Sequence, residues 1–174
     1  MHASQNPLLE NFYDPRVALA GQSHILEPMR SILLVEDHAI FASVLIRLLR
    51  AAGDLAVARV AKSAEEALQY LPDQEYDLVL VDVSLPKMNG INLVSLIHDR
   101  YPDLPCLMVS GHMLDHYVQG ALQAGARGYV LKDNPVAILA AIRLVLTGGT
   151  YISNELRDDT RSPSVANGRN GVTE

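Results

Sequence analysis

Short apolar runs alternate with amphipathic stretches along most of the chain, from about residue 31 to residue 147. The clearest run, 78–81, reads Leu-Val-Leu-Val and contains no polar residue. A strand that is apolar at every position is typical of a parallel sheet covered on both faces, because neither side of it meets water. We expect strands at 31–35, 55–60, 78–81, 106–110 and 128–131.

Helix signals fill the gaps between these runs. Apolar residues recur at helical spacing over 41–52 and stop at Gly53, a residue type that often ends helices. Ser63, followed three residues later by Glu66, forms a capping-box pattern, and Pro135 can open a helix at its first position. The apolar positions of the first stretch are Phe41, Val44, Leu45, Leu48 and Ala52. We expect helices at about 41–52, 64–71, 91–101, 115–124 and 135–147.

Five strands alternating with five helices indicate a doubly wound α/β domain. Parallel strands need a long crossover connection, usually a helix, and such crossovers are right-handed. We therefore expect a five-stranded parallel sheet in the flavodoxin-like order 2-1-3-4-5, with helices on both faces.

We expect one domain between two less ordered ends. Residues 1–28 mix Asn, Gln, Pro and His with isolated apolar residues that follow neither period, which predicts an extension that is disordered or loosely docked. Residues 29–156 would form the domain itself, and a hydrophobic content of 49% is enough for a sizeable core. Residues 157–174 are rich in Asp, Thr, Arg, Ser, Asn and Gly, so we expect a disordered tail or a truncated linker.

Charged and polar side chains stand at the ends of the expected strands. Glu36 and Asp37 follow the first strand, Asp82 follows the third, Ser110 ends the fourth and Lys132 follows the fifth. In open parallel sheets the ligand site lies outside the carboxyl ends of the strands. Three carboxylates, a hydroxyl and an amine are therefore expected to converge at one edge of the sheet.

This set of groups suits phosphoryl chemistry. Clustered carboxylates repel each other, which is tolerable when a hard cation such as Mg²⁺ lies among them. An aspartate such as Asp82 can attack a phosphoryl group and hold it as an acyl phosphate. The cation and the ammonium of Lys132 would neutralise the transferring group, and the hydroxyl of Ser110 would donate a hydrogen bond to it.

Composition excludes other classes of function. The 174 residues carry a net charge of −6, and the sequence pI is about 5.4, so the chain lacks the basic surface of a nucleic-acid-binding protein. The single cysteine, Cys106, cannot form an internal disulfide, which favours a reducing cytoplasm. No apolar stretch approaches the roughly 20 residues of a membrane span, so we expect no membrane partner.

Four motifs together resemble one known family. They are Leu-Leu-Val-Glu-Asp-His at 33–38, the stretch 77–90 ending in Leu-Pro-Lys-Met-Asn-Gly, Met-Val-Ser-Gly-His at 108–112, and Ala-Gly-Ala-Arg-Gly-Tyr-Val-Leu-Lys-Asp at 124–133. From residue 31 to about 153 the chain is similar to the receiver domain of a two-component response regulator. Any one of these motifs alone would be weak, but the combination is specific.

The resemblance implies a phosphorylation-dependent signalling receiver. Its partner would be a histidine kinase or a phosphotransfer protein, and the chain would catalyse only its own phosphorylation and dephosphorylation, so it would not be an enzyme in the ordinary sense. The implied site residues are Asp82 as phosphoacceptor, Ser110 and Lys132 as contacts of the phosphoryl group, Glu36, Asp37, Asp82 and the backbone carbonyl of Ser84 as ligands of Mg²⁺, and Ser110 with Tyr129 as the switch.

The subfamily with LuxR-like helix-turn-helix output is the most similar, through the segments 128–133 and 147–153. In that subfamily one more residue often separates the Lys-Asp pair from the helix-opening proline. Nothing after Ser153 resembles a helix-turn-helix, so we expect no DNA binding by this chain alone. In a longer natural protein a DNA-binding domain would lie downstream.

Other interpretations of the same residues stay open at this point. Glu36 and Asp37 could cap the first helix, and Tyr129 could simply pack in an edge strand. A haloacid-dehalogenase-type phosphatase also uses an aspartate at a strand end, but it requires a second aspartate where this chain has Ser84. The remaining alternative is a receiver-like module that binds a protein partner without phosphorylation.

The helix expected at 136–146 is apolar on more than one side. Arg143 is its single charged residue, and an outer helix of a doubly wound domain should have one face in water. We expect this surplus to form a homodimer interface, although scattered exposed alanines and leucines are also common.

Overall fold

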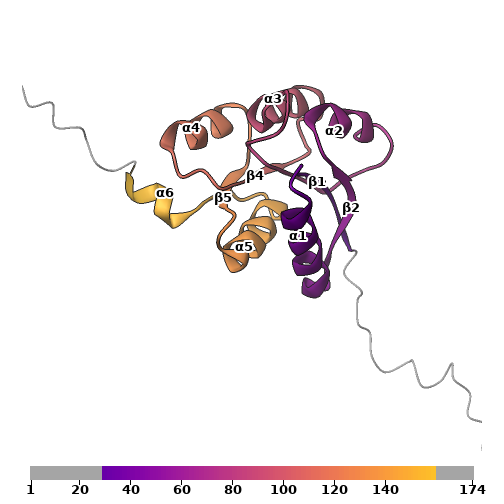
Figure 1. The fold of residues 1–174 in the computed structure, drawn as a ribbon, viewed down its shortest axis with the longest axis horizontal. Coiled ribbons are helices and arrows are strands. Elements are labelled where there is room, and N and C mark those ends of the chain that lie inside the picture. The colour runs from indigo at the N-terminus through magenta and orange to yellow at the C-terminus, as the bar shows by residue number, and fades with distance from the viewer. Residues whose placement is uncertain (1–28, 160–174) are drawn as a thin grey trace, which may run out of the picture.

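The computed structural model describes residues 29–159, which form a parallel sheet covered by helices on both faces (Figure 1). The sheet has six strands in the order β2-β1-β3-β4-β5-β6, and every neighbouring pair is parallel. The strands are β1 (Arg30–Val35), β2 (Leu55–Ala61), β3 (Leu78–Val81), β4 (Cys106–Ser110), β5 (Gly128–Leu131) and β6 (Tyr151–Ile152).

Figure 1 shows helices α1 and α5 on one face of the sheet and α2, α3 and α4 on the other. The core is split in the same way, since one buried cluster lies under α1 and α5 and a second lies under α2, α3 and α4. The helices are α1 (Ala39–Ala52), α2 (Ala64–Tyr70), α3 (Gly90–Arg100), α4 (Asp115–Gln123), α5 (Pro135–Leu146) and a short α6 (Asn154–Asp159).

The predicted doubly wound order 2-1-3-4-5 is confirmed, with one addition. The two-residue strand β6 extends the sheet beyond β5, so the expectation of five strands was one too few, and Tyr129 does not lie in an edge strand. A strand this short has no periodic pattern to detect. Gly128 permits the pairing, because a β-carbon there would lie only 2.5 Å from the carbonyl oxygen of Tyr151.

The first helix packs most of the expected apolar residues against the core, but it is turned so that one of them faces out. Ala42, Leu45 and Leu49 are its buried residues, whereas Val44, which we expected on the buried face, is 53% exposed. Helical spacing allowed either stripe, since leucine and alanine surround the helix on several sides. The sheet selects the stripe that includes the small Ala42.

The predicted helix caps are largely present. The Ser63 hydroxyl accepts from the Glu66 N–H at 3.2 Å, but the Glu66 carboxylate accepts from the N–H of Lys62 and not from that of Ser63. Asn134 caps α5 by accepting from Ala137 N–H at 3.0 Å, and Pro135 occupies the first turn as expected.

Residues 153–156, near the end of the described chain, still pack against the domain. Leu156 is 1% exposed, and the buried hydroxyl of Ser153 accepts from the N–H of Leu131 at 3.2 Å. Helix α6 runs across 156/157, where we expected the domain to stop. The extension 1–28 and residues 160–174 lie outside the described residues. Within 29–159, no helix is long and apolar enough to cross a membrane.

Candidate functional site

The sheet ladder fixes the side chains at the carboxyl ends of the strands. Backbone N–H groups just beyond the strands still donate to the neighbouring strand: Glu36 to the carbonyl of Ala61 at 2.9 Å, and Asp82 to that of Val35 at 3.0 Å. Lys132 likewise donates to the carbonyl of Ser110 at 2.9 Å. The backbone positions from which these side chains project are therefore fixed by the sheet.

Three carboxylates meet at this edge, as the sequence predicted. Glu36, Asp37 and Asp82 each offer one carboxylate oxygen, and these atoms lie within 4.8 Å of one another. Glu36 and Asp82 are buried, with 2% and 6% exposure, while Asp37 faces solvent. Two buried anions and an exposed one around a shared point suit a hard divalent cation with an open, hydrated side, so these residues fit Mg²⁺.

Lys132 joins the cluster from β5. Its Nζ lies 2.6 Å from Oε2 of Glu36 and 2.9 Å from Oδ2 of Asp82, and its side chain is 21% exposed. Burial alone would lower the pKa of Lys132, but the hydrogen bonds and charges of the two carboxylates raise it, so the ammonium stays protonated. Burial also raises the pKa of Glu36, helped by the negative charge of Asp82 and opposed by Lys132.

The acidic pair does not cap the first helix. The N-cap of α1 is His38, whose side chain accepts from the N–H of Phe41 at 3.4 Å, so the capping interpretation of Glu36 and Asp37 was wrong. The second carboxylate oxygen of Glu36 instead accepts from the N–H of His38 at 3.0 Å. Glu36 therefore links the start of α1 to Lys132.

Ser110 and Tyr129 are joined through His112. The Ser110 hydroxyl accepts from the N–H of His112 at 3.1 Å, and the Tyr129 hydroxyl donates to the carbonyl of the same residue at 2.9 Å. Tyr129 is fully buried, and this burial raises the pKa of its hydroxyl. The histidine ring also contacts the exposed Ser84, with Nε2 and Oγ 2.8 Å apart, and stacks on Tyr117 with ring centroids 4.9 Å apart.

The loop after Asp82 packs tightly against the backbone of that residue. A β-carbon added at Gly90 would collide with the carbonyl oxygen of Asp82. Lys87, in the same loop, has a φ of 64°, the only positive φ of a non-glycine residue between 29 and 159. The Gly at the end of the 77–90 motif is thus required by close packing against the site, whereas the sequence suggested only a turn.

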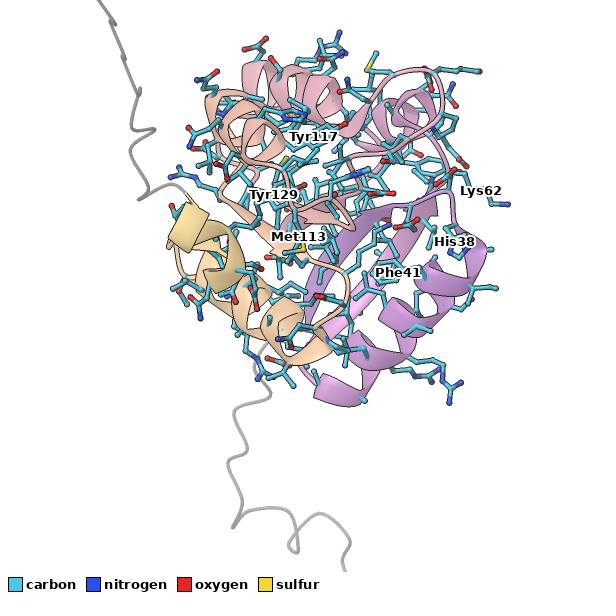
Figure 2. All side chains as sticks on the ribbon, turned by 60° about the vertical axis from the view of Figure 1, so that its left-hand side comes forward. His38, Phe41, Lys62, Met113, Tyr117 and Tyr129 are labelled. Carbon is cyan, nitrogen blue, oxygen red and sulfur yellow. The ribbon has the colours of Figure 1, made fainter. Side chains whose placement is uncertain are left out.

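Sequence reasoning missed one side chain and one set of backbone contacts at the site. Phe41, which we had assigned only to the apolar face of the first helix, lies with its ring centroid 4.5 Å from Lys132 Nζ. The backbone contacts of His112 to Ser110 and Tyr129 have no sequence signal at all. Figure 2 shows Phe41 and His38 at the start of α1.

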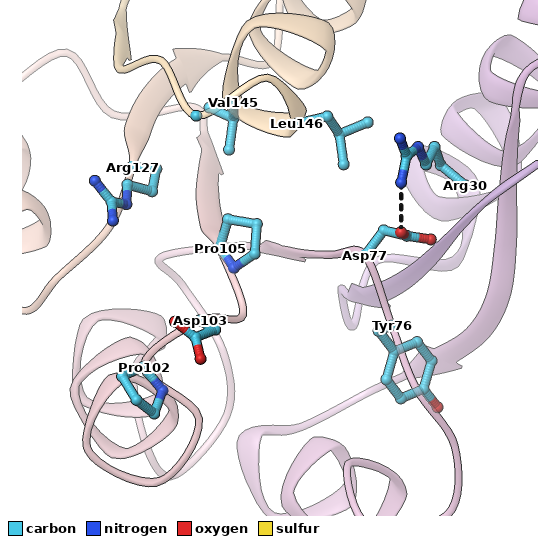
Figure 3. A pocket seen from close by; sticks show the side chains of 10 residues that line it. Arg30, Tyr76, Asp77, Pro102, Asp103, Pro105, Arg127, Val145 and Leu146 are labelled. Atoms are coloured by element: carbon cyan, nitrogen blue, oxygen red, sulfur yellow. Dashed lines mark hydrogen bonds and ion pairs between the residues drawn. The ribbon is translucent and has the colours of Figure 1, made fainter.

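Two pockets differ in their relation to this cluster. A pocket of about 270 Å³ adjoins it and is lined by residues of the loops after β4 and β5, including Ser110, Met113 and Lys132. A second, of about 360 Å³, lies at the opposite edge of the sheet, between Arg30, Asp103 and Arg127 (Figure 3). The second contains none of the predicted site residues.

Comparisons with known proteins agree with the geometry. A family model described as the response regulator receiver domain matches residues 32–143. The chain is 32% identical over 122 residues to the transcriptional regulatory protein DegU of Brevibacillus brevis, covering 70% of this chain and 52% of DegU. It is 35% identical over 127 residues to the DNA-binding transcriptional activator DevR/DosR of Mycobacterium tuberculosis, covering 72% of this chain and 58% of that protein.

A solved structure gives the same result. The chain superposes on a LuxR-family two-component response regulator from Aurantimonas sp. SI85-9A1 with a TM-score of 0.72 and 29% identity, covering 75% of this chain and 94% of the other. Against the two regulators above, the chain spans only between about half and three fifths of their length.

Proposed function

The chain belongs to the response regulator receiver domain family, and we propose that it accepts a phosphoryl group on Asp82 from a histidine kinase or a phosphotransfer protein. The observation that carries the proposal is the position of Asp82. It is a buried carboxylate that lies between the ammonium of Lys132 and two further carboxylates, Glu36 and Asp37.

The chemistry follows from these positions. A carboxylate oxygen of Asp82 attacks phosphorus, and the bond from phosphorus to the donor nitrogen breaks, with its electron pair leaving on the donor imidazole. Lys132 balances the charge of the phosphoryl oxygens, and the Ser110 hydroxyl can donate to one of them. Glu36, Asp37, Asp82 and the backbone carbonyl of Ser84 would hold Mg²⁺, which when bound would neutralise charge on the phosphoryl group.

Incubation with acetyl phosphate tests this proposal. We expect labelling of the protein in Mg²⁺, no labelling in EDTA, and no labelling of Asp82→Asn under either condition. Asp77→Asn is the matched control, because Asp77 is also an aspartate beside β3 but lies at the opposite edge. Metal-independent labelling, or labelling of Asp82→Asn, would contradict the assignment. Absence of labelling with intact folding would favour the alternative, a receiver-like module that binds a partner without phosphorylation.

The switch would use the contacts of His112. Because Ser110 and Tyr129 both bind the backbone of His112, movement of the Ser110 hydroxyl toward a phosphoryl group would release one of these contacts. The loop before α4 would then change position, and with it the surface that it carries.

The output surface would include the outer side of α5. Val136 is 77% exposed and Leu144 is 42% exposed, and Ile40 and Val44 on α1 are also exposed on this face of the sheet. We propose that residues 136–146 form a homodimer interface that phosphorylation strengthens.

Two exposed residues of α5 can test this interface, whereas Leu139 packs partly against the core and is unsuitable for a test. The double variant Val136→Glu, Leu144→Glu should stay monomeric in sedimentation, whereas Gln69→Glu on α2 should sediment like the wild type. A wild type that is monomeric with and without phosphorylation would contradict the interface.

Two further expectations concern DNA binding and cellular location. This chain by itself should not bind DNA sequence-specifically, because no helix-turn-helix pattern follows Ser153 and the net charge is −6. A cytoplasmic location is in keeping with the single thiol, that of Cys106, which is buried and free.

A further inference from the structure

The ammonium of Lys132 has three neighbours, and only two of them are carboxylates. Besides Glu36 and Asp82, the ring of Phe41 lies 4.5 Å away, measured from Nζ to the ring centroid. This distance is within the range of about 6 Å over which a cation is attracted to the face of an aromatic ring. An ammonium has three N–H donors, and the ring is a third close partner beside the two carboxylates.

The ring of Phe41 is held at the start of α1. The backbone N–H of Phe41 contacts the N-cap His38 in the first turn of α1, and its side chain packs partly buried against the cluster under α1 and α5. Lys132 reaches this position on a flexible four-carbon stem from the end of β5. The ring belongs to the packed start of α1, whereas the ammonium is positioned by its contacts at the end of a flexible stem.

We propose that Phe41 is a positioning residue for phosphorylation, holding the Lys132 ammonium toward Asp82 and keeping water from its remaining side. The proposal rests on the proposed function, since it concerns how readily Lys132 meets the transferring group. Without the ring, the ammonium can turn toward solvent, and a smaller fraction of molecules has it aligned with Asp82. The competing view is that Phe41 is an ordinary core residue, which any apolar side chain of similar size could replace.

Three replacements of Phe41 separate these views, each measured as the initial rate of labelling by acetyl phosphate in Mg²⁺. Phe41→Leu keeps an apolar side chain without a ring, and 3,4,5-trifluorophenylalanine keeps the shape but weakens the negative ring face. Both should lower the rate about three- to tenfold, with an unchanged thermal midpoint for the fluorinated protein. Phe41→Tyr keeps the ring face and should stay within about twofold of the wild type.

A fluorinated protein as fast as the wild type would overturn the proposal, because only the shape of the ring would then matter. Equal losses in Phe41→Leu and Phe41→Tyr would overturn it as well.

The contact itself can be measured without phosphorylation. The chain has three lysines, Lys62, Lys87 and Lys132, so their side-chain methylene resonances can be assigned individually. In metal-free protein the methylene protons next to Nζ of Lys132 should be shifted upfield by the ring current of Phe41, and Phe41→Leu should remove the shift. No upfield shift in the wild type would refute the ring contact. If the upfield shift is present but Asp82 is not labelled, the result counts against the proposed function and not against the ring contact.

Discussion

The two edges of the sheet carry the same kinds of charged pair in different surroundings. At the carboxyl edge Lys132 pairs with Glu36, and their side chains are 21% and 1% exposed. At the amino edge Arg30 pairs with Asp77 at 3.0 Å, with 47% and 34% exposure (Figure 3). A second amino-edge pair, Arg143 with Asp54, is similarly exposed.

The difference in burial separates a site from a scaffold. Exposed pairs contribute little to stability because water and salt screen them. Buried charges are costly unless they are paired, so a fold that retains several of them at one edge keeps them for another purpose. Asp77 serves the scaffold, since it also accepts from the N–H of Ser31 at 2.7 Å. Glu36 also accepts from a backbone N–H, that of His38, so the edges differ in burial and in the number of carboxylates around one cation.

The largest effect is expected from Gly90→Ala. Its β-carbon would collide with the carbonyl oxygen of Asp82, a residue whose N–H is bonded to β1, so we expect a loss of about 3 kcal/mol in the free energy of unfolding. Gly111, in the loop after β4, has open space around it, and Gly111→Ala should cost far less. Urea unfolding of both variants measures the contrast, and equal losses would mean that the loop after Asp82 adjusts freely.

Loss of the cation at each edge gives the next largest effect. Lys132→Met leaves Glu36 and Asp82 close together without a counter-charge, and in EDTA we expect it to destabilise the fold by about 2 kcal/mol, the partial exposure of Lys132 reducing the cost of a fully buried break. Arg30→Met should cost less than about 1 kcal/mol. Urea unfolding decides the matter, and a Lys132→Met variant as stable as Arg30→Met would remove the distinction between the edges.

Much of the carboxyl edge could be predicted from sequence because it depends on where strands end. The apolar run 78–81 stops at Asp82, and a parallel sheet brings the corresponding ends of β1, β4 and β5 to the same edge. Alternation predicted a doubly wound sheet, and the flavodoxin-like order was chosen among the known orders of such sheets. These are one-dimensional signals that the fold converts directly into position.

What could not be predicted depends on rotation and contact between elements. The rotation of α1, which buries Ala42 and directs Phe41 toward Lys132, is set by the sheet, because the sequence offers apolar residues on several sides of the helix. Strand β6 is too short for a period. The link from Ser110 through His112 to Tyr129 uses backbone atoms, which any residue type supplies.

Stabilisation by Mg²⁺ should also distinguish the two edges, with a smaller change in the free energy of unfolding. A ligand that binds only the native state stabilises it by mass action, so Mg²⁺ at ten times its dissociation constant should add about 1.4 kcal/mol. Asp37→Asn should lose most of this gain, whereas Asp77→Asn should retain it, since Asp77 lies at the amino edge. Thermal unfolding over a Mg²⁺ titration measures the gain, and the same gain in Asp37→Asn would argue against the metal site.

The smallest effect expected is a difference in pH dependence. Burial raises the pKa of Glu36 above 4.5, so its contribution to stability is greatest below about that pH and falls as pH rises through the raised pKa. The hydrogen bond from Arg143 lowers the pKa of the exposed Asp54 below 3.8, so its contribution is present above that value and is lost as pH falls.

The difference in unfolding free energy between wild type and variant, measured in EDTA, should therefore change with pH in opposite directions for Glu36→Gln and Asp54→Asn. Slopes of the same sign would show that the two edges do not differ in how they hold carboxylates.

The central claim is that Asp82, at the carboxyl edge, accepts a phosphoryl group. Reductive trapping tests this claim most directly. Protein treated with acetyl phosphate and Mg²⁺ is reacted with borohydride, which reduces only the acyl phosphate, and is then digested and mapped by mass spectrometry. The account predicts a single modified aspartate, Asp82, with Asp37 and Asp77 unmodified and no modification in EDTA. A modified aspartate elsewhere, with Asp82 intact, would contradict it.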